Sequence, residues 1–196
     1  MTNAKLTLDD IADLRAYERE REEFRNRIIA LKRVRRVSIG PVVTLVFENR
    51  DTIRFQVQEM ARAEKLISDE QIQAELDVYN PLVPEPGRLT ATLFVELVSK
   101  DEMTEWLPKL VGIERSIVLH LGGDDVVRAT VDEAHAEQLT REEVTASVHY
   151  VRFELTPEQV DRFDTDEVTL AADHPGYAHA TVLTAETKAS LLADLH

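Results

Sequence analysis

The densest group of polar and charged side chains that could bind a ligand or take part in catalysis lies between residues 54 and 64. It combines two arginines, two glutamines and two carboxylates: Arg54, Gln56, Gln58, Glu59, Arg62 and Glu64. Guanidinium and amide groups donate hydrogen bonds to anions, and arginine also pairs with carboxylates. The cluster therefore predicts either a site that binds a partner protein or a small anionic ligand, or a structural ion-pair network. No nucleophile with an adjacent base accompanies it, so no catalytic residue is assigned.

A second group of functional side chains surrounds Pro175 and consists of Asp173, His174 and His179. Two histidines and a carboxylate can bind iron, manganese or zinc, so a metal-binding protein or metal-dependent enzyme is the alternative function. The structural interpretation is a tight turn, in which proline forces the preceding residue to be extended. We expect the turn, because three ligands leave a metal site short of ligands, and we expect no cofactor.

Several classes of chemistry are excluded by residues that the chain does not contain. It has no cysteine, which excludes disulfides, thiolate zinc sites, cysteine-ligated iron–sulfur clusters and a cysteine nucleophile. It also lacks the phosphate-loop, dinucleotide-binding, nucleophile-elbow and H-E-x-x-H motifs. The sequence thus favours a binding protein over an enzyme.

Charge is distributed unevenly along the 196 residues, whose net charge is −14. Residues 1–98 carry 15 basic and 17 acidic side chains, whereas residues 99–196 carry 8 and 20. A basic tract at residues 25–36 could contact phosphates, but the acidic total disfavours nucleic acid as a partner. No apolar run is long enough to span a membrane, and we expect a cytoplasmic protein. A homo-oligomer is left open.

The elements that must position these side chains follow from periodicity. Apolar residues from Ile11 to Leu31 recur at helical spacing, with Arg21 interrupting the stripe, and predict a long helix of about six turns. Val37 and Ile39 alternate before a break at Gly40-Pro41, residues 42–47 form a nearly continuous apolar strand, and residues 53–57 alternate again, which predicts a β-hairpin. Arg54 and Gln56 then share one face of the second strand, and Glu59 and Arg62 share a helix face just after it.

The rest of the chain mixes strands with capped helices. Strands are predicted at 89–97, 117–121, 126–131, 148–155, 168–172 and 180–183, and helices at 60–67, 71–79, 99–110, from 157 and at 185–195; residues 132–145 read as a polar, helix-prone excursion. The predicted fold class is α+β, a single domain over residues 1–196 with a subdivision allowed at the proline-rich residues 81–87. Its long N-terminal helix packs on a largely antiparallel or mixed sheet, with further short helices.

Three segments carry a resemblance to a known family: RFQVQEM at 54–60, ELDVYNPL at 75–82 and DHPGY at 173–177. They resemble a bacterial family known only as a domain of unknown function, and the likeness extends over nearly the whole chain. Genes of that family lie near rubrerythrin-like and iron–sulfur oxidoreductase genes. The resemblance therefore implies an accessory role in oxidative-stress or redox metabolism, and it supplies no catalytic residues.

Overall fold

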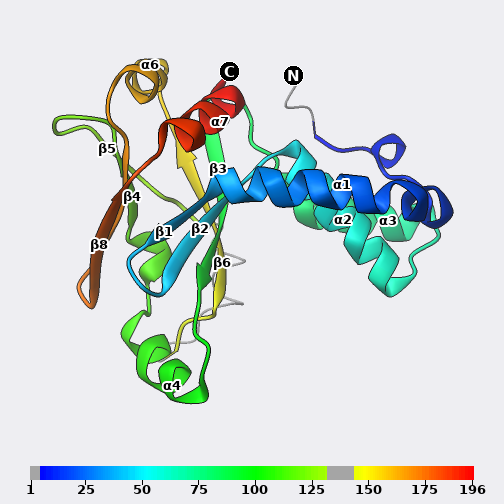
Figure 1. The fold of residues 1–196 in the computed structure, drawn as a ribbon, viewed down its shortest axis with the longest axis horizontal. Helices are drawn as coiled ribbons and strands as arrows, with labels where there is room; N and C mark the ends of the chain where they lie inside the picture. Colours follow the sequence, from blue (N-terminus) through cyan, green and yellow to red (C-terminus); the bar gives the residue numbers. More distant parts are fainter. Residues whose placement is uncertain (1–4, 132–143) are drawn as a thin grey trace.

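The computed structural model describes residues 5–131 and 144–196 and shows an α+β architecture. Two four-stranded antiparallel sheets face each other, and a set of helices projects away from them (Figure 1). We call the sheets with their adjoining helices the body, and the projecting helices the arm. The predicted fold class is confirmed, including the long N-terminal helix and the antiparallel pairing.

The first sheet of the body contains both strands that lead into and out of the arm. In spatial order its strands are β1 (Arg36–Ile39), β2 (Val43–Glu48), β3 (Arg88–Val95) and β6 (Val148–Glu154). The arm is thus an excursion of the chain between neighbouring antiparallel strands, β2 and β3, with α1 preceding β1.

The second sheet is built from the C-terminal half of the chain. Its strands in spatial order are β5 (Val126–Arg128), β4 (Ile117–His120), β7 (Thr169–His174) and β8 (Tyr177–Val182). The two sheets are joined at both sides. A bridge pairs Thr130 with Arg152 on β6, and the hydroxyl of Thr181 donates a hydrogen bond to the carbonyl oxygen of Ser38 at 2.6 Å.

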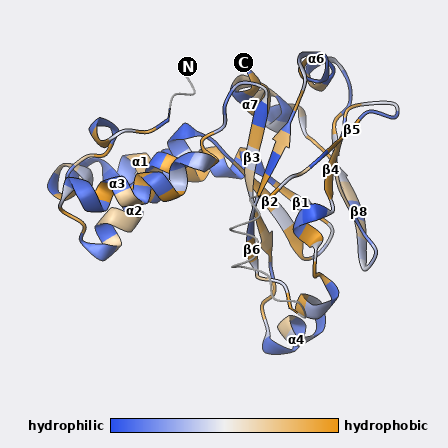
Figure 2. Ribbon diagram, turned by 180° about the vertical axis from the view of Figure 1, so that it is seen from behind, coloured by the Kyte–Doolittle hydropathy of each residue, from blue (hydrophilic) through white to orange (hydrophobic). Residues whose placement is uncertain are grey.

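One continuous hydrophobic core fills the space between the sheets. Alternate residues of each strand face inward, as the period of two requires; on β2 these are Val43, Leu45 and Phe47, all fully buried. Phe47 packs against Phe153 of β6 with ring centroids 6.2 Å apart. In Figure 2 the hydrophobic colour gathers in the strands, whereas the arm is largely hydrophilic on its outside.

The arm consists of α1 (Leu14–Arg35), α2 (Arg50–Glu64) and α3 (Asp69–Tyr79), with short 3-10 helices η1 (Leu8–Asp10) and η2 (Asn80–Leu82) at its ends. The capping-box residues at Thr7 open η1 only, and α1 begins at Leu14 with Asp13 as its cap. Only the C-terminal end of α1 reaches the body, where it contacts β2 and α7; most of its length packs on α2.

The strand predicted at residues 53–57 is wrong, because this segment lies inside α2. A capping box between Asn49 and Thr52 opens the helix. Its buried face contains Ile53, Val57 and Ala61, four residues apart, as a helical stripe requires.

Phe55 explains why the same segment resembles a strand. It lies on the neighbouring face of α2 and packs edge-on against Phe24 of α1, with ring centroids 5.5 Å apart. Because α2 meets one neighbour with each of two faces, apolar residues occur at every second position without a strand being formed.

The remaining helices cover the body: α4 (Lys100–Lys109), η3 (Ile113–Arg115), α6 (Pro157–Thr165) and α7 (Ala185–Leu195). Pro108 lies in the last turn of α4, which ends one residue later. Most of the polar excursion predicted at 132–145 lies outside the described residues. None of the described helices combines the length and the apolar character of a membrane span.

Candidate functional site

The polar cluster of residues 54–64 does not have the geometry that the sequence predicted. Since these residues belong to α2, Arg54 and Gln56 share no strand face. They point about 200° apart around the helix, because each residue advances by about 100°. The expectation that the pair faces away from Ile53, Phe55 and Val57 as one polar surface is therefore wrong.

Glu59 is the centre of the hydrogen bonds that this cluster makes. Its two carboxylate oxygens accept from Nε and Nη2 of Arg21, both at 2.8 Å, and Oε1 also accepts from the hydroxyl of buried Tyr17 at 2.7 Å. The Arg21 guanidinium lowers the pKa of the Glu59 carboxyl. Burial, and then the bond to Glu59, raises the pKa of Tyr17 well above its usual range. The arginine that interrupts the apolar stripe of α1 is thus the partner of this carboxylate.

The other members of the cluster also bind the segment formed by η1 and α1. Arg54 donates from Nε to the carbonyl oxygen of Asp10 at 2.7 Å. The amide of Gln58 pairs with both backbone groups of Ala12, at 3.0 and 2.8 Å. Arg62 forms an exposed ion pair with Glu18 at 2.5 Å, while Gln56 is half-buried and Glu64 is exposed. These hydrogen bonds and ion pairs connect α2 to η1 and α1 and stabilise the arm.

Asp173, His174 and His179 are not brought together as a metal site. Asp173 pairs with Arg128 of β5, at 3.0 and 2.5 Å, and it lies on the opposite face of β7 from His174. Both ring nitrogens of His174 are engaged, since Nε2 donates to the carbonyl oxygen of Val111 at 3.0 Å and Nδ1 accepts from the amide of Gly176 at 3.1 Å. Among residues 5–131 and 144–196, no three histidine or acidic side chains form a metal-binding group.

The loop at residues 173–177 is shorter than predicted, because β7 extends to His174 and β8 begins at Tyr177. The hydroxyl of Tyr177 donates to the carbonyl oxygen of Ile39 at 2.5 Å and accepts from the amides of Val42 and Val43 at 3.0 and 3.2 Å. The hairpin therefore fastens the second sheet to the β1–β2 turn, as a structural turn does.

Several cations of the basic tract at residues 25–36 make contacts within the chain. Arg36 pairs with Glu96, and Lys32 lies 3.9 Å from a carboxylate oxygen of Glu48. Arg27 lies over the ring of Phe24. The exposed Arg25 and Arg33 make no such contact among the residues that the structure describes.

Arg35 is buried at 1% exposure where the arm joins the body. Its guanidinium donates to the carbonyl oxygens of Phe47 and Glu48, to Ser190 and to the carboxylate of Asp194. Burial raises the pKa of Asp194, and Arg35 opposes that shift. This side chain links α1, β2 and α7.

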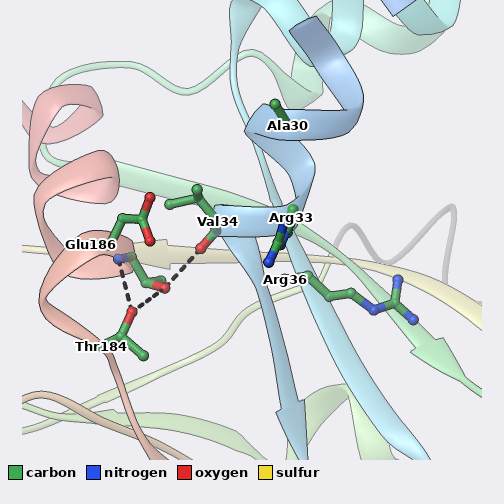
Figure 3. A pocket seen from close by; sticks show the side chains of 7 residues that line it. Ala30, Arg33, Val34, Arg36, Thr184 and Glu186 are labelled. Carbon is green, nitrogen blue, oxygen red and sulfur yellow. Dashed lines mark hydrogen bonds between the residues drawn. The ribbon is translucent and has the colours of Figure 1, made fainter. Parts of the chain in front are cut away.

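A pocket of about 540 Å³ opens beside this joint, between the end of α1 and the first turn of α7 (Figure 3). Its lining consists of Ala30, Arg33, Val34, Arg36, Thr184, Glu186 and Thr187. Thr187 donates from its hydroxyl to the carbonyl oxygen of Val34 at 2.7 Å, which fixes the two helices against each other. Arg33 is exposed and has no hydrogen-bond or ion-pair partner in the part of the chain that the structure describes.

A family model described as a protein of unknown function, DUF3501, matches residues 5–195. The chain belongs to this family. The crystal structure of a novel protein of unknown function from Burkholderia pseudomallei K96243 is similar to this chain, with a TM-score of 0.89 and 38% sequence identity. That similarity covers 98% of this chain and 100% of the other. The comparison with curated proteins gives no match.

Membership of DUF3501 confirms the resemblance to a family of unknown function and assigns no role to any residue. Sequence reasoning missed the pocket, because its lining comes from segments about 150 residues apart. One signal was available: Arg33 and Arg36 are three residues apart at the end of a predicted helix. Nothing in the sequence indicated that α7 would supply the opposite wall.

Proposed function

We propose that the protein is a non-catalytic binding protein whose pocket between α1 and α7 holds a small anionic ligand. The observation that carries the proposal is Arg33, an exposed guanidinium that lines a pocket of about 540 Å³ and has no partner among the described residues. The volume is within the range of about 300–1,000 Å³ that is typical of small-molecule sites. A guanidinium stays charged at any physiological pH and can bind a carboxylate or phosphate with two parallel hydrogen bonds.

Arg36 and Glu186 refine the kind of anion that fits. The pair with Glu96 uses one terminal nitrogen of Arg36, which leaves its other nitrogens as donors toward an anion. Glu186 lies on the opposite wall and repels negative charge. The proposal therefore favours a compact anion held on the arginine side. The family resemblance implies an accessory role in redox metabolism. In this proposal the protein fulfils that role by binding the anion, without catalysing a reaction.

Isothermal titration calorimetry with inorganic phosphate and with citrate tests the proposal. We expect Arg33→Ala to weaken binding by about tenfold or more, since a charge-assisted hydrogen bond contributes about 1.5–3 kcal/mol. Glu186→Gln should tighten it by removing the opposing charge. Arg25→Ala is the matched control, because Arg25 is an exposed arginine of α1 outside the pocket. Absence of binding, or equal losses in the Arg33 and Arg25 variants, would refute the proposal.

A protein partner is the second candidate, and a specific feature of the arm favours it. Ile67, in the turn between α2 and α3, is 84% exposed. Ile67 is one of eight aliphatic residues that line a hollow at the end of the arm, and contiguous apolar surface is typical of protein-interaction sites.

A further inference from the structure

The tip of the arm carries a second hollow, which is apolar and faces away from the body. It lies between η1, the start of α1, and the turn that joins α2 to α3, at the end of the arm that Figure 1 shows farthest from the sheets. Its lining consists of Leu8, Ile11, Ala12, Asp13, Leu14, Arg15, Ala61, Leu66, Ile67, Asp69 and Ile72, and its volume is about 280 Å³. We call it the tip groove.

The size and floor of the tip groove suit one large side chain rather than a small-molecule ligand. Its volume is below the range of about 300–1,000 Å³ found for small-molecule sites. Eight of its eleven lining residues are aliphatic, and the other three are charged. Protein interfaces, in contrast, are commonly anchored by a single large apolar or aromatic side chain that fills such a hollow. Ile67 stands at its edge with 84% of its surface exposed, and burying it would add to the affinity.

The charges around the tip groove define its partner further. Two carboxylates line it, Asp13 and Asp69, against one cation, Arg15. Glu70 is exposed next to Asp69, and its pKa is lowered by a backbone hydrogen bond and by Ser68, so it is ionised at neutral pH. Lys65, exposed next to Leu66, adds a second cation, so the rim carries one net negative charge. Charge complementarity across an interface selects partners and speeds their encounter.

We infer that the tip groove is a docking site for a helix of a partner protein, one that presents a large apolar side chain flanked by lysine or arginine. A helix can present one apolar anchor to the hollow while its basic flanking residues meet the carboxylates of the rim. This inference gives the second candidate function a location and a partner chemistry, and it does not depend on the anion pocket.

The test uses the full chain and a defined probe: an 18-residue helical peptide of leucine and lysine with one central tryptophan and a fluorescent label. A second peptide replaces every lysine with glutamate. Fluorescence anisotropy should give saturable binding of the lysine peptide and none of the glutamate peptide. Ile67→Asp should weaken binding by about tenfold or more, as the loss of an interface anchor does.

Val98→Asp is the matched control, because Val98 lies in the body, is 92% exposed and acquires the same charge. Its affinity should stay within about twofold of the parent. Equal affinities of the Ile67 and Val98 variants would show attraction to the acidic surface as a whole and overturn the inference, as would absence of binding to the parent chain. Circular dichroism of each variant confirms that both remain folded. Phosphate binding by the same variants separates this inference from the anion proposal.

Discussion

The arm and the body are stabilised by different interactions. The body has one continuous apolar core between two sheets. The arm has two small apolar clusters, one around Val57 and one around Phe24, and between them a ladder of polar contacts that includes Arg21–Glu59 and Gln58–Ala12. Apolar burial is insensitive to protonation, whereas ion pairs require both partners charged. We therefore expect acid and salt to affect the arm before the body.

The largest effect is expected where the two regions meet. Arg35→Ala removes the buried guanidinium that pairs with the Asp194 carboxylate and donates to two β2 carbonyl groups. Removing one partner of a buried ion pair costs roughly 3–5 kcal/mol. Urea unfolding should show a loss of that size, with the neighbouring Arg33→Ala, an exposed residue, close to the parent. A loss under about 1 kcal/mol in Arg35→Ala would mean that the joint is not a stabilising centre.

A smaller effect is expected at the β1–β2 turn of the body. Gly40 has φ +70°, and an added Cβ would lie 2.5 Å from Cγ of His179 and 2.7 Å from the Tyr177 hydroxyl. Gly40→Ala should cost about 1–2 kcal/mol for the left-handed backbone, plus the cost of moving both rings. Gly123→Ala isolates the first part, since Gly123 has φ +54° and no atom within 4 Å of an added Cβ. Equal losses of stability in the two variants would contradict the packing role of the Tyr177 hairpin.

Acid should separate the two regions without any mutation. The Arg21 guanidinium depresses the pKa of Glu59 below its ordinary value of 4.5. The stability from this contact is therefore present above about pH 4.5 and is lost as the pH falls through the lowered pKa of the folded state. Trp106, the single tryptophan, packs against Tyr177 in the body and reports on it alone. The helical circular dichroism signal should fall at a higher pH than Trp106 fluorescence changes; coincident transitions would show one cooperative unit.

The smallest effect is expected for an exposed ion pair between two helices of the arm. Arg62 and Glu18 form an ion pair with both side chains largely in solvent. Arg62→Ala should change the free energy of unfolding by less than about 1 kcal/mol, and less still in high salt. A thermal melt in low and high salt measures this. A drop comparable to that of Arg35→Ala would place Arg62 in the structural framework of the arm.

Local signals were enough to predict most elements of the fold. The helices predicted at 71–79, at 99–110 and from 157 are present, opened by capping boxes at Ser68, Ser99 and Thr156. Strands β2, β3 and β6 lie where apolar runs and alternation predict them. The segment at 53–57 was misread because Phe55 faces α1, a contact that no local rule contains. The loop predicted at 173–177 was too long for the same reason. Its ends, His174 and Tyr177, pair across the β7–β8 hairpin, and this pairing cannot be read from the local sequence.

The candidate sites were harder to predict than the fold, because a charged side chain has the same sequence signature whether it is paired or free. The cluster was selected because it places Arg54, Glu59 and Arg62 close together in the sequence. In the structure each of them bonds to a partner at least 38 residues away. In the sequence, Arg33 cannot be distinguished from the other cations of the basic tract at residues 25–36. It stands apart only once its neighbours Lys32, Arg35 and Arg36 are seen to be engaged.

The continuity of α1 has a mechanical consequence. The helix has 22 residues, which corresponds to a length of about 33 Å, and no break occurs along it. The tip groove lies at its first turn and the anion pocket at its last, with Arg35 as the pivot next to the pocket. A stiff helix of this length keeps the two hollows at a fixed separation, and the hydrogen bond from Thr187 to Val34 holds its inner end against α7. Occupants of the two hollows would therefore bind at opposite ends of one continuous helix, too far apart to touch each other.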